Sequence, residues 1–498
     1  MTLVERLAQH AATSPQRTAL SWPGGRYSYA ELLAEIALAA ELLRESNADL
    51  LALDIDNGPA WVALDIAALQ LGICVIPLPP FFSGGQLRHL LQRAGVQLVI
   101  SEDPERLFRR AGLQPYGLRQ RVVLGGRQLV RMVVDRRRST SVPAGIHKIT
   151  FTSGTTGEPK GVMLSWRQMR PVVESLAQAA ELQAGDRHLA LMPLAVLLEN
   201  IGGVYAPLWA GARVEIPPVA QAGMTGSSQI DAELLQRTLE EAGATSAIFT
   251  PQIVLSLVER LERSPGHRLA LRFAAVGGAP MPPRLLQRAA AVGLPIFEGY
   301  GLSECASVVC LNTPRHNRPG SVGKPLPHVR LRIADDGEIL LGGAAFAGYL
   351  GERPPSAEAQ EYWPSGDLGE LDSDGFLYLH GRRRNIFISA FGRNIAPEWV
   401  EHELTLEPEI AQVAVFGEAR PFVVAVVVAG NGATPVQIDA ALMRSNRSLP
   451  DYAQVTRWIS ADAPFSHSNG MLTGTGRIRR SSVYRHYRQS LESLYCEA

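Results

Sequence analysis

Along roughly the first 380 residues, short apolar runs alternate with segments whose apolar positions recur at helical spacing. Ser28 and Glu31 form a capping-box signature, which predicts a helix beginning beside them. The apolar stripe of this helix consists of Leu32, Leu33, Ile36, Ala40 and Leu43. Strands are predicted over 51–55, 98–101, 247–250, 273–276 and 295–297, and helices over 231–242, 253–261 and 282–291. Such alternation favours a largely parallel, doubly wound α/β sheet that binds ligands at the carboxyl ends of its strands.

The pattern changes at residue 329. Short strands over 329–333, 338–341 and 376–379 are separated by turns rich in Asp and Gly. After residues 381–385 the predicted order becomes strand, helix, strand, strand, helix, strand, helix. This order indicates a compact α+β module of about 110 residues. Within it we expect a helix over 397–404 and strands over 413–416 and 422–428.

Composition argues against several classes of protein. Of the 498 residues, 46% are apolar, which suffices for a sizeable core, and the length predicts roughly three structural units. The formal net charge is zero, which argues against a general binder of nucleic acids or membrane surfaces. The four cysteines show neither a disulfide framework nor zinc-site spacing. The cleanest apolar run, 422–429, has strand length, and no signal peptide is evident, so we expect a cytoplasmic protein without a transmembrane segment.

The stretch from Thr150 to Gly161 combines hydroxyls, glycines and a lysine after a predicted strand. Glycines let backbone N–H groups turn toward an anion, hydroxyls add donors, and Lys160 adds a full positive charge. The stretch is therefore a candidate phosphate-binding loop, although the spacing of a Walker A motif is absent. A polar surface loop is the alternative interpretation.

This loop resembles the phosphate loop of the adenylate-forming superfamily, which includes acyl-CoA synthetases, adenylation domains of peptide synthetases, and luciferase. Further motifs that resemble those of the superfamily follow in order. They are residues 277–280 (the adenine-side turn), 298–304 (Glu-Gly-Tyr-Gly-Leu-Ser-Glu), 365–367 (Ser-Gly-Asp, the ribose motif), 381–385 (the hinge) and 391–398 (the start of the C-terminal domain). The order of these motifs makes the resemblance specific, and it covers about residues 20 to 480.

The resemblance implies that Asp367 accepts hydrogen bonds from both ribose hydroxyls, with a turn aspartate as the alternative. Arg382 would hold ribose or phosphate through its guanidinium, or else belong to a solvated basic loop. Tyr300 could stack on the adenine, and Ser303 keeps the hydroxyl of the usual Thr. The implied nucleotide-binding residues are Thr152, Ser153, Gly154, Thr155, Thr156, Gly157, Gly278, Ala279, Pro280, Glu298, Gly299, Tyr300, Gly301, Ser303, Asp367 and Arg382.

The resemblance assigns the chemistry to Lys160, Glu304 and Arg477. Glu304 is a hard oxygen ligand that would bind Mg²⁺ at the phosphates of ATP. Arg477 occupies the position at which the superfamily usually carries a lysine that touches both the carboxylate and AMP. The positive charge is kept, but a planar fork replaces a compact ammonium. Three alternatives follow: Arg477 acts at an altered rate, arginine suits this site, or the first step is lost.

The resemblance also implies the architecture. Residues 1–383 would form an N-terminal AMP-binding domain of parallel doubly wound sheets plus a small distorted barrel, whose β-rich part spans 329–380. Residues 384–498 would form a small, mobile α+β C-terminal domain. Arg384 and Asn385 would belong to the hinge, and Gly392 would line the channel for the thiol because it has no side chain.

The implied reaction joins a carboxylic acid to AMP, releases pyrophosphate, and then transfers the acyl group to a thiol, most simply that of CoA. Residues 189–211 resemble the substrate-side segment of fatty acyl-CoA synthetases, with Val196 where those often carry His. Residues 189–198 contain no carboxylate for an ammonium group, which favours a hydrophobic, fatty acid and a role in fatty acid metabolism. A core helix is the alternative for this segment. A carrier protein is the alternative acceptor, and a catalytically weak adenylate-binding protein is the alternative function.

Overall fold

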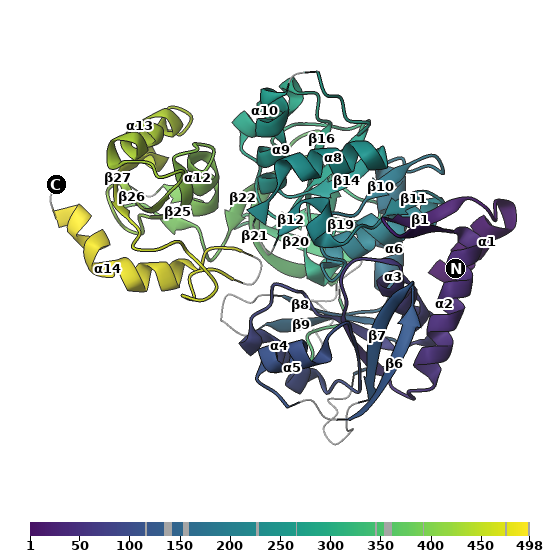
Figure 1. Ribbon diagram of the computed structural model, residues 1–498. Helices are drawn as coiled ribbons and strands as arrows, with labels where there is room; N and C mark the ends of the chain where they lie inside the picture. Colours follow the sequence, from purple (N-terminus) through teal and green to yellow (C-terminus); the bar gives the residue numbers. More distant parts are fainter. Residues whose placement is uncertain are drawn as a thin grey trace.

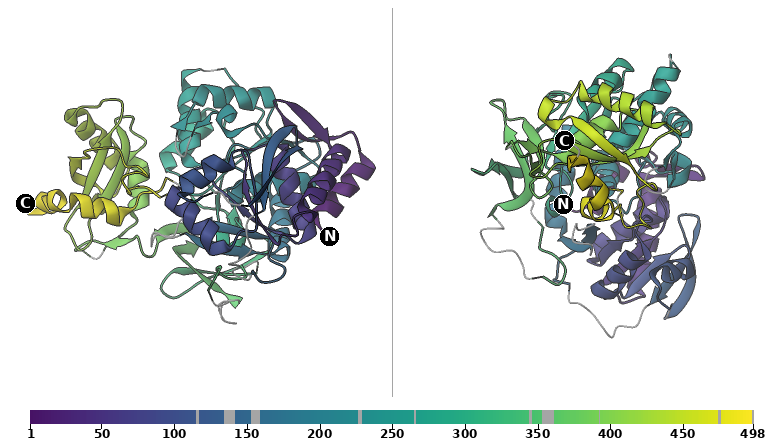
Figure 2. Two further views of the ribbon diagram at one scale, coloured as in Figure 1. Left: turned by 60° about the horizontal axis from the view of Figure 1, so that its bottom comes forward. Right: turned by 90° about the vertical axis from the view of Figure 1, so that its left-hand side faces the viewer.

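The computed structural model describes residues 1–114, 117–133, 142–152, 159–225, 229–264, 266–343, 346–352, 361–391, 393–473 and 476–496. Two large sheets form the greater part of the molecule, and a smaller C-terminal part lies beside them (Figure 1; Figure 2). A curled four-stranded sheet lies between these parts along the chain. The α/β fold predicted from the sequence is confirmed.

The first large sheet has the strand order β6-β7-β5-β3-β4-β8-β9. Its central pairs are parallel, whereas the pairs at both edges are antiparallel. Its strands are β3 (Leu50–Asp54), β4 (Cys74–Pro77), β5 (Leu98–Ser101), β6 (Leu118–Leu124), β7 (Arg127–Val133), β8 (Lys148–Thr152) and β9 (Lys160–Leu164). The candidate phosphate loop therefore joins the two antiparallel strands β8 and β9 at one edge.

The second large sheet has the order β18-β17-β16-β15-β14-β10-β11-β1-β2 and is parallel from β1 through β11 to β16. Its strands are β1 (Thr18–Trp22), β2 (Gly25–Ser28), β10 (Arg187–Leu189), β11 (Arg213–Glu215), β14 (Ser246–Phe249), β15 (Phe273–Val276), β16 (Ile296–Tyr300), β17 (Cys310–Leu311) and β18 (Lys324–Pro325). A short hairpin, β12 (Met224–Thr225) and β13 (Gln229–Ile230), lies outside it.

Helices cover both faces of each large sheet. The largest apolar cluster joins the two sheets through α2 and α3, while α4 and α5 cover the far face of the first and α8 to α10 that of the second. The predicted capping box is present, because Ser28 Oγ accepts from the Glu31 amide at 3.2 Å. The helices are α1 (Leu3–Thr13), α2 (Tyr29–Arg44), α3 (Pro59–Leu71), α4 (Gly84–Ala94), α5 (Pro104–Ala111), α6 (Trp166–Ala179), α7 (Ala206–Ala210), α8 (Ala232–Ala242), α9 (Pro251–Arg263) and α10 (Pro283–Ala291).

The distorted barrel predicted around residues 329–380 takes the form of a curled antiparallel sheet. Its strands are β19 (Val329–Ile333), β20 (Glu338–Gly343), β21 (Trp363–Leu371) and β22 (Leu377–Arg382). One face packs on the second large sheet through Ile339, Leu341 and Leu377, which are fully buried with Tyr300 and Val309. This packing holds β21 and β22 against the end of β16.

The C-terminal part has the predicted order of elements, except that two short strands rather than one precede its first helix. Its elements are β23 (Phe387–Ile388), β24 (Asn394–Ile395), α12 (Pro397–Leu404), β25 (Ile410–Phe416), β26 (Val423–Ala429), α13 (Pro435–Asn446), β27 (Val455–Ser460) and α14 (Arg480–Cys496). Strand β26 is central, and its alternate residues enter two different apolar clusters, one on each face. Burial on both faces explains its uninterrupted apolar sequence.

The segment 189–211, for which a core helix was an alternative, is not one helix. Leu189 ends β10, a turn follows, and the chain then forms a π-helix (Glu199–Tyr205) that continues into α7. Glu199 is fully buried, and its Oε2 accepts from the Met192 amide at 3.2 Å. The carboxylate thus holds the turn closed, and irregular helical turns of this kind are frequent at functional sites.

A buried polar network joins this π-helix to both the first sheet and α3. Lys148 Nζ lies 2.8 and 3.0 Å from the two carboxylate oxygens of Asp65 and 3.2 Å from the Tyr205 hydroxyl, and it also contacts Asn200. Asp65 in turn accepts from Asn200 at 3.0 Å and from Tyr205 at 2.5 Å. Burial lowers the pKa of Lys148, and Asp65 opposes that shift. The network fixes β8, which leads into the candidate phosphate loop.

We expect Lys148→Met to lower the free energy of unfolding by about 3–5 kcal/mol, because it leaves the Asp65 carboxylate buried without a cation. The measurement is urea denaturation followed by circular dichroism. The double variant Lys148→Met/Asp65→Leu serves as the control and should lose clearly less than the single variant. An unchanged single variant would show that the pair does not stabilise the fold.

Candidate active site

The Asp367 carboxylate is the buried centre of the candidate site. Strand β21 carries Asp367 directly opposite Arg382 of β22, and Arg382 Nε lies 2.7 Å from Asp367 Oδ1. The Tyr300 hydroxyl, at the end of β16, donates to Asp367 Oδ2 at 2.6 Å. Burial raises the pKa of Asp367, while Arg382 and the hydrogen bond from Tyr300 lower it. The structure thus brings together three residues assigned to the ribose and base by the resemblance.

The glycines near this centre let backbone segments approach closely. A Cβ on Gly301 would lie 1.6 Å from the carbonyl oxygen of Ser307, so no side chain fits there. Gly278 has a φ of +88°, in the left-handed region that favours glycine. Ala279 and Pro280 follow it with exposed side chains. This turn and the segment around Gly299 are connected through parallel pairing of β15 and β16.

Arg477 reaches this turn from the C-terminal part. Its Nη2 donates to the Gly278 carbonyl at 2.8 Å. Its own loop is closed by two hydrogen bonds with Thr473, from Thr473 N to Arg477 O at 2.7 Å and from Arg477 N to Thr473 Oγ1 at 3.0 Å. Desolvation and Arg382 lower the pKa of Arg477, whereas Asp367 and Glu398 raise it. The guanidinium therefore faces the same charged groups that surround the Asp367 carboxylate.

Tyr349 connects Lys160 with Glu304. Its hydroxyl donates to Glu304 Oε1 at 2.8 Å, and Lys160 Nζ lies 4.6 Å from the centre of its ring. Lys160 Nζ also pairs with Glu352 at 3.0 Å. Burial and the adjacent Glu304 carboxylate raise the pKa of Tyr349. Tyr349 and Glu352 were not identified from the sequence, because nothing in a lone tyrosine after an apolar run signals such a contact.

Glu298 and Ser303 occupy other positions around the site. Glu298 is buried, and its Oε2 accepts from the Gly320 amide at 2.7 Å. Burial raises the pKa of Glu298 to about 7, although the Gly320 amide lowers it. Ser303 begins the short helical turn 303–305 that also carries Glu304. One oxygen of the Glu298 carboxylate is thus already occupied by a backbone amide of the protein. Ser303 and Glu304, by contrast, lie next to each other on one short helical turn.

The proposed hinge residues lie at the end of β22. Asn385 Nδ2 donates to Glu398 Oε1 at 2.6 Å, and Arg480 Nη1 donates to the same oxygen at 2.9 Å. Arg384 is exposed, and desolvation followed by Arg382 lowers its pKa. Glu398 therefore links the hinge segment to the start of α14, three residues after Arg477.

Of the predicted residues in the candidate phosphate loop, Thr152 is the first and belongs to the described part of the chain. Thr152 ends β8, and its Oγ1 donates to the Lys160 carbonyl at 3.5 Å. The other loop residues, Ser153, Gly154, Thr155, Thr156 and Gly157, and the channel residue Gly392 are not described. Among the described residues, no group of three or more His, Cys, Asp or Glu side chains is arranged to hold a metal ion.

Two family models match most of the chain. Residues 7–350 match the AMP-binding enzyme family, and residues 385–498 match the C-terminal domain of AMP-binding enzymes. The chain belongs to the AMP-binding enzyme family. The resemblance read from the motifs of the sequence is therefore confirmed at the level of the family, and the role of each motif residue stays a prediction. Among the described residues of the enzyme, no helix is long and apolar enough to cross a membrane.

Similar proteins include a long-chain-fatty-acid–CoA ligase, FadD15, of Mycobacterium bovis, with 29% identity over 92% of each chain. A 2-succinylbenzoate–CoA ligase of Bacillus cereus is 28% identical over 84% of this chain and 85% of its own. Among solved structures, an anthranilate CoA ligase in complex with anthranoyl-AMP has a TM-score of 0.80 and 20% identity, over 98% and 97% of the two chains. The prediction of an AMP-forming acid–thiol ligase is confirmed, while the acids of these proteins differ.

We expect Asp367→Ala to weaken ATP binding at least about tenfold, because it removes the acceptor proposed for ribose and leaves Arg382 and Tyr300 without their partner. Isothermal titration calorimetry measures the affinity. Asp374→Ala is the control, since Asp374 lies in the exposed turn between the same two strands and pairs with Arg318. An unchanged ATP affinity in Asp367→Ala would remove Asp367 from the nucleotide site.

Proposed function

We propose that this AMP-binding enzyme converts a hydrophobic carboxylic acid, most simply a fatty acid, to an acyl-adenylate and then to an acyl-CoA. The single observation that carries the proposal is the contact of Arg477 with the Gly278 carbonyl, beside the Asp367–Arg382 pair. It supports a site in which a cation from the C-terminal part meets the nucleotide-binding side of the large part. We place the enzyme in the cytoplasm.

In the first step, a carboxylate oxygen of the acid attacks the α-phosphorus of ATP, and the bond to pyrophosphate breaks. Both reactants are anions, so the step needs positive charge at the place where they meet. Lys160, Arg382 and Arg477 would supply this charge from three different segments of the chain. Asp367 would orient the ribose, and Arg382, fixed by Asp367, would have little freedom left to lose on binding.

Mg²⁺ suits Glu304. Among the described residues, the Tyr349 hydroxyl is the partner of its carboxylate, and it uses one oxygen, Oε1. Mg²⁺ is commonly held by one or two carboxylates together with phosphate oxygens, so a single carboxylate here fits the ion without a cluster of acids. When bound, the ion would neutralise charge on the phosphates of ATP. Tyr349 would hold the Glu304 carboxylate in place.

In the second step, the sulfur of a thiol attacks the acyl carbon, the bond to the AMP oxygen breaks, and the thiol proton goes to solvent or a nearby base. A rotation about the hinge at Arg384 and Asn385 would first remove Arg477 and admit the thiol past Gly392. CoA is the proposed acceptor, and a carrier protein is the alternative.

The acid is proposed to be hydrophobic because of the segment before the π-helix. Leu198 lies beside the glycine turn, since a Cβ on Gly277 would lie 3.7 Å from its Cδ2. Glu199, which directly follows Leu198 in the sequence, accepts a hydrogen bond from the Met192 amide through Oε2. Its Oε1 lies 3.5 Å from His188 Nε2. Because the buried Glu199 carboxylate already contacts the Met192 amide and His188, we do not expect it to bind the ammonium group of an amino acid. Apolar side chains would therefore select the acid by its length.

ATP–pyrophosphate exchange with a panel of fatty and aromatic acids tests the proposal. We expect exchange that depends on a hydrophobic acid, followed by thioester formation when CoA is added. Thioester with a carrier protein but not with CoA would favour the alternative acceptor. Binding of ATP without exchange, for every acid, would contradict the proposal and favour an adenylate-binding protein in which Arg477 does not replace lysine.

We expect Lys160→Ala and Glu304→Ala each to slow exchange by at least about 100-fold, because each removes a group that stabilises charge on the phosphates. Initial rates at saturating acid measure the effect. Lys324→Ala is the control, because Lys324 Nζ lies over the Phe376 ring, 4.7 Å from its centre, and takes no part in the proposed chemistry. Exchange close to the original rate in either variant would exclude that residue from the site.

We expect Arg477→Lys to preserve or raise the rate of the first step, because the sequence around position 477 resembles the lysine-bearing loop of the superfamily and the charge is retained. Pre-steady-state formation of the acyl-adenylate measures it, with Arg477→Gln as the variant that lacks the charge. A collapse of the rate in Arg477→Lys would instead mean that the guanidinium fork itself is required.

A further inference from the structure

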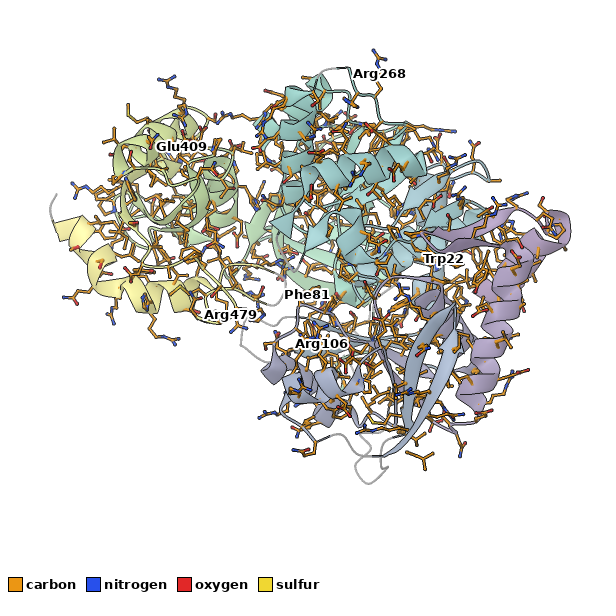
Figure 3. All side chains as sticks on the ribbon, in the orientation of Figure 1. Trp22, Phe81, Arg106, Arg268, Glu409 and Arg479 are labelled. Atoms are coloured by element: carbon orange, nitrogen blue, oxygen red, sulfur yellow. The ribbon has the colours of Figure 1, made fainter. Side chains whose placement is uncertain are left out.

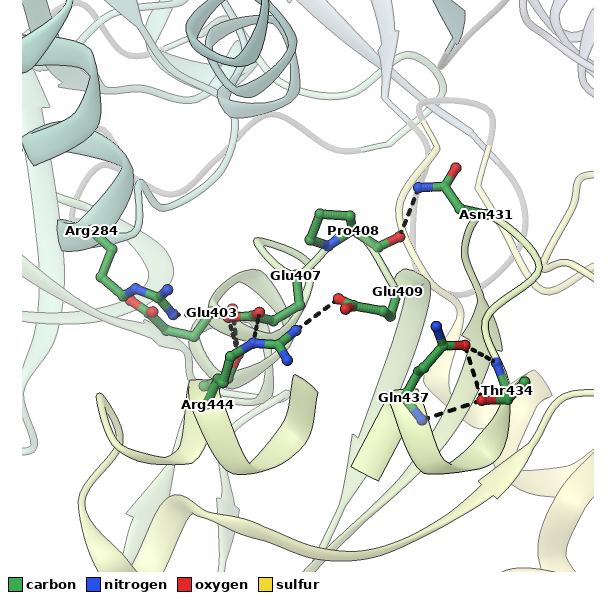
Figure 4. Close-up of polar contacts among 10 residues, drawn as sticks. Arg284, Glu403, Glu407, Pro408, Glu409, Asn431, Thr434, Gln437 and Arg444 are labelled. Carbon is green, nitrogen blue, oxygen red and sulfur yellow. Dashed lines mark hydrogen bonds and ion pairs between the residues drawn. The ribbon is translucent and has the colours of Figure 1, made fainter. Parts of the chain in front are cut away.

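The C-terminal part contacts the large part at a second place, on helix α10. Leu406, which follows α12, is buried in the apolar cluster of the second large sheet together with Met281, Leu285 and Ala289. Beside it, Arg284 Nη1 lies 3.2 Å from Glu407 Oε1 (Figure 4). The contact therefore combines an apolar side chain inserted into the other part with an ion pair across the junction.

Glu407 is held firmly within the C-terminal part. Arg444 Nε donates to its Oε2 at 2.7 Å, the Ser445 hydroxyl donates to its Oε1 at 3.3 Å, and Arg444 Nη2 donates to Glu409 at 2.8 Å (Figure 4). Glu407 is buried, whereas Arg284 keeps 41% of its side chain exposed. The pair is thus a fixed carboxylate met by a cation that remains partly in solvent.

Arg284 also influences a second carboxylate. Glu403 is buried, and desolvation raises its pKa while Arg284 lowers it. Its Oε2 is buried without a hydrogen-bond partner among the described residues. Removal of Arg284 would therefore leave two buried carboxylates facing α10 without this compensating charge.

One short segment of the large part carries both contacts. Gly278, which receives Arg477, and Arg284, which receives Glu407, are six residues apart at the turn into α10. Both partners belong to the C-terminal part, but they come from different elements of it. A body held at two points of the same segment has much less freedom to tilt than a body held at one.

We propose that Arg284, Leu406 and Glu407 are positioning residues that dock the C-terminal part on α10 and so place Arg477 at Gly278 for the first step. The inference rests on the proposed function for its effect on rate, but the docking itself does not. Because the docked arrangement serves only the first step, weakening it slows adenylate formation and leaves the thiol step unchanged or faster.

The pose is measured without any reaction by fluorescence energy transfer between labels at Arg268→Cys and Met443→Cys. Both positions are exposed, one in each part, and Arg268 is labelled in Figure 3. Cys74, Cys305 and Cys310 are buried, and Cys496 is changed to Ser in this background. We expect Arg284→Glu to reduce the docked population, because it places two carboxylates opposite each other, and Arg284→Glu/Glu407→Gln to restore part of it.

The rates are measured in parallel on the unlabelled proteins. We expect Arg284→Glu to lower ATP–pyrophosphate exchange about tenfold in kcat with little change in the KM for ATP, and Leu406→Ala to act in the same direction. Conversion of preformed acyl-adenylate to thioester should not slow. Arg284→Ala is compared with Arg288→Ala, which lies one turn along the same helix. Arg288 pairs with Glu262 of the large part and interacts with Glu407 only through the electrostatic field, so Arg284→Ala should lower exchange clearly more than Arg288→Ala.

Unchanged energy transfer in Arg284→Glu, an equal loss in both half-reactions, or no recovery in the double variant would overturn the inference. If Arg284→Glu does not fold, Glu407→Gln alone gives the same comparison, because it removes the charge that Arg284 meets. If the original enzyme shows no exchange with any acid, the proposed function fails, while the energy-transfer measurement still decides whether these residues dock the C-terminal part.

Discussion

The burial of the Asp367 carboxylate is the constraint on which the candidate site depends. A carboxylate out of water is stable only if charge and hydrogen bonds replace the water that it has lost. Arg382 and Tyr300 do so here, and they come from the curled sheet and from the second large sheet. The three residues can meet only when these sheets are packed together. The Asp367 carboxylate, which we propose to bind ribose, therefore has both of its partners only when the two sheets are correctly packed.

Each of the three cations of the candidate site also contacts other protein groups that hold its side chain. Arg382 is fixed by Asp367, Lys160 lies against Tyr349 and Glu352, and Arg477 is held by its bonds with Thr473 and by the Gly278 carbonyl. Three segments that are far apart in the sequence thus present cations that already have partners, and in the proposed reaction their orientations would be set before a substrate arrives. Such preorganisation is the main way in which a protein stabilises charge that develops during a reaction.

Periodicity was sufficient to predict the α/β fold and, apart from one additional short strand, the order of elements in the C-terminal part. The small distorted barrel and the shared site of Asp367, Arg382 and Tyr300 were predicted instead from the resemblance of short motifs to those of the adenylate-forming superfamily. Tyr349 was missed because its role comes from the approach of two segments, and no local pattern records that approach. The pair of Arg284 and Glu407 was missed for the same reason, since 123 residues separate them. Segment 189–211 was hard to interpret because the Glu199 side chain, rather than backbone periodicity, determines its turn.

The two-faced burial of strand β26 has a mechanical consequence. The apolar clusters on either side of it consist entirely of residues between Phe387 and Tyr495, so the C-terminal part carries its own interior. Apart from Leu406, none of its described residues belongs to the apolar clusters of the large part. In the proposed rotation about the hinge, the C-terminal part would therefore move as a rigid body. Its interior would stay intact, and only the few side chains that contact the large part would have to separate and form new contacts.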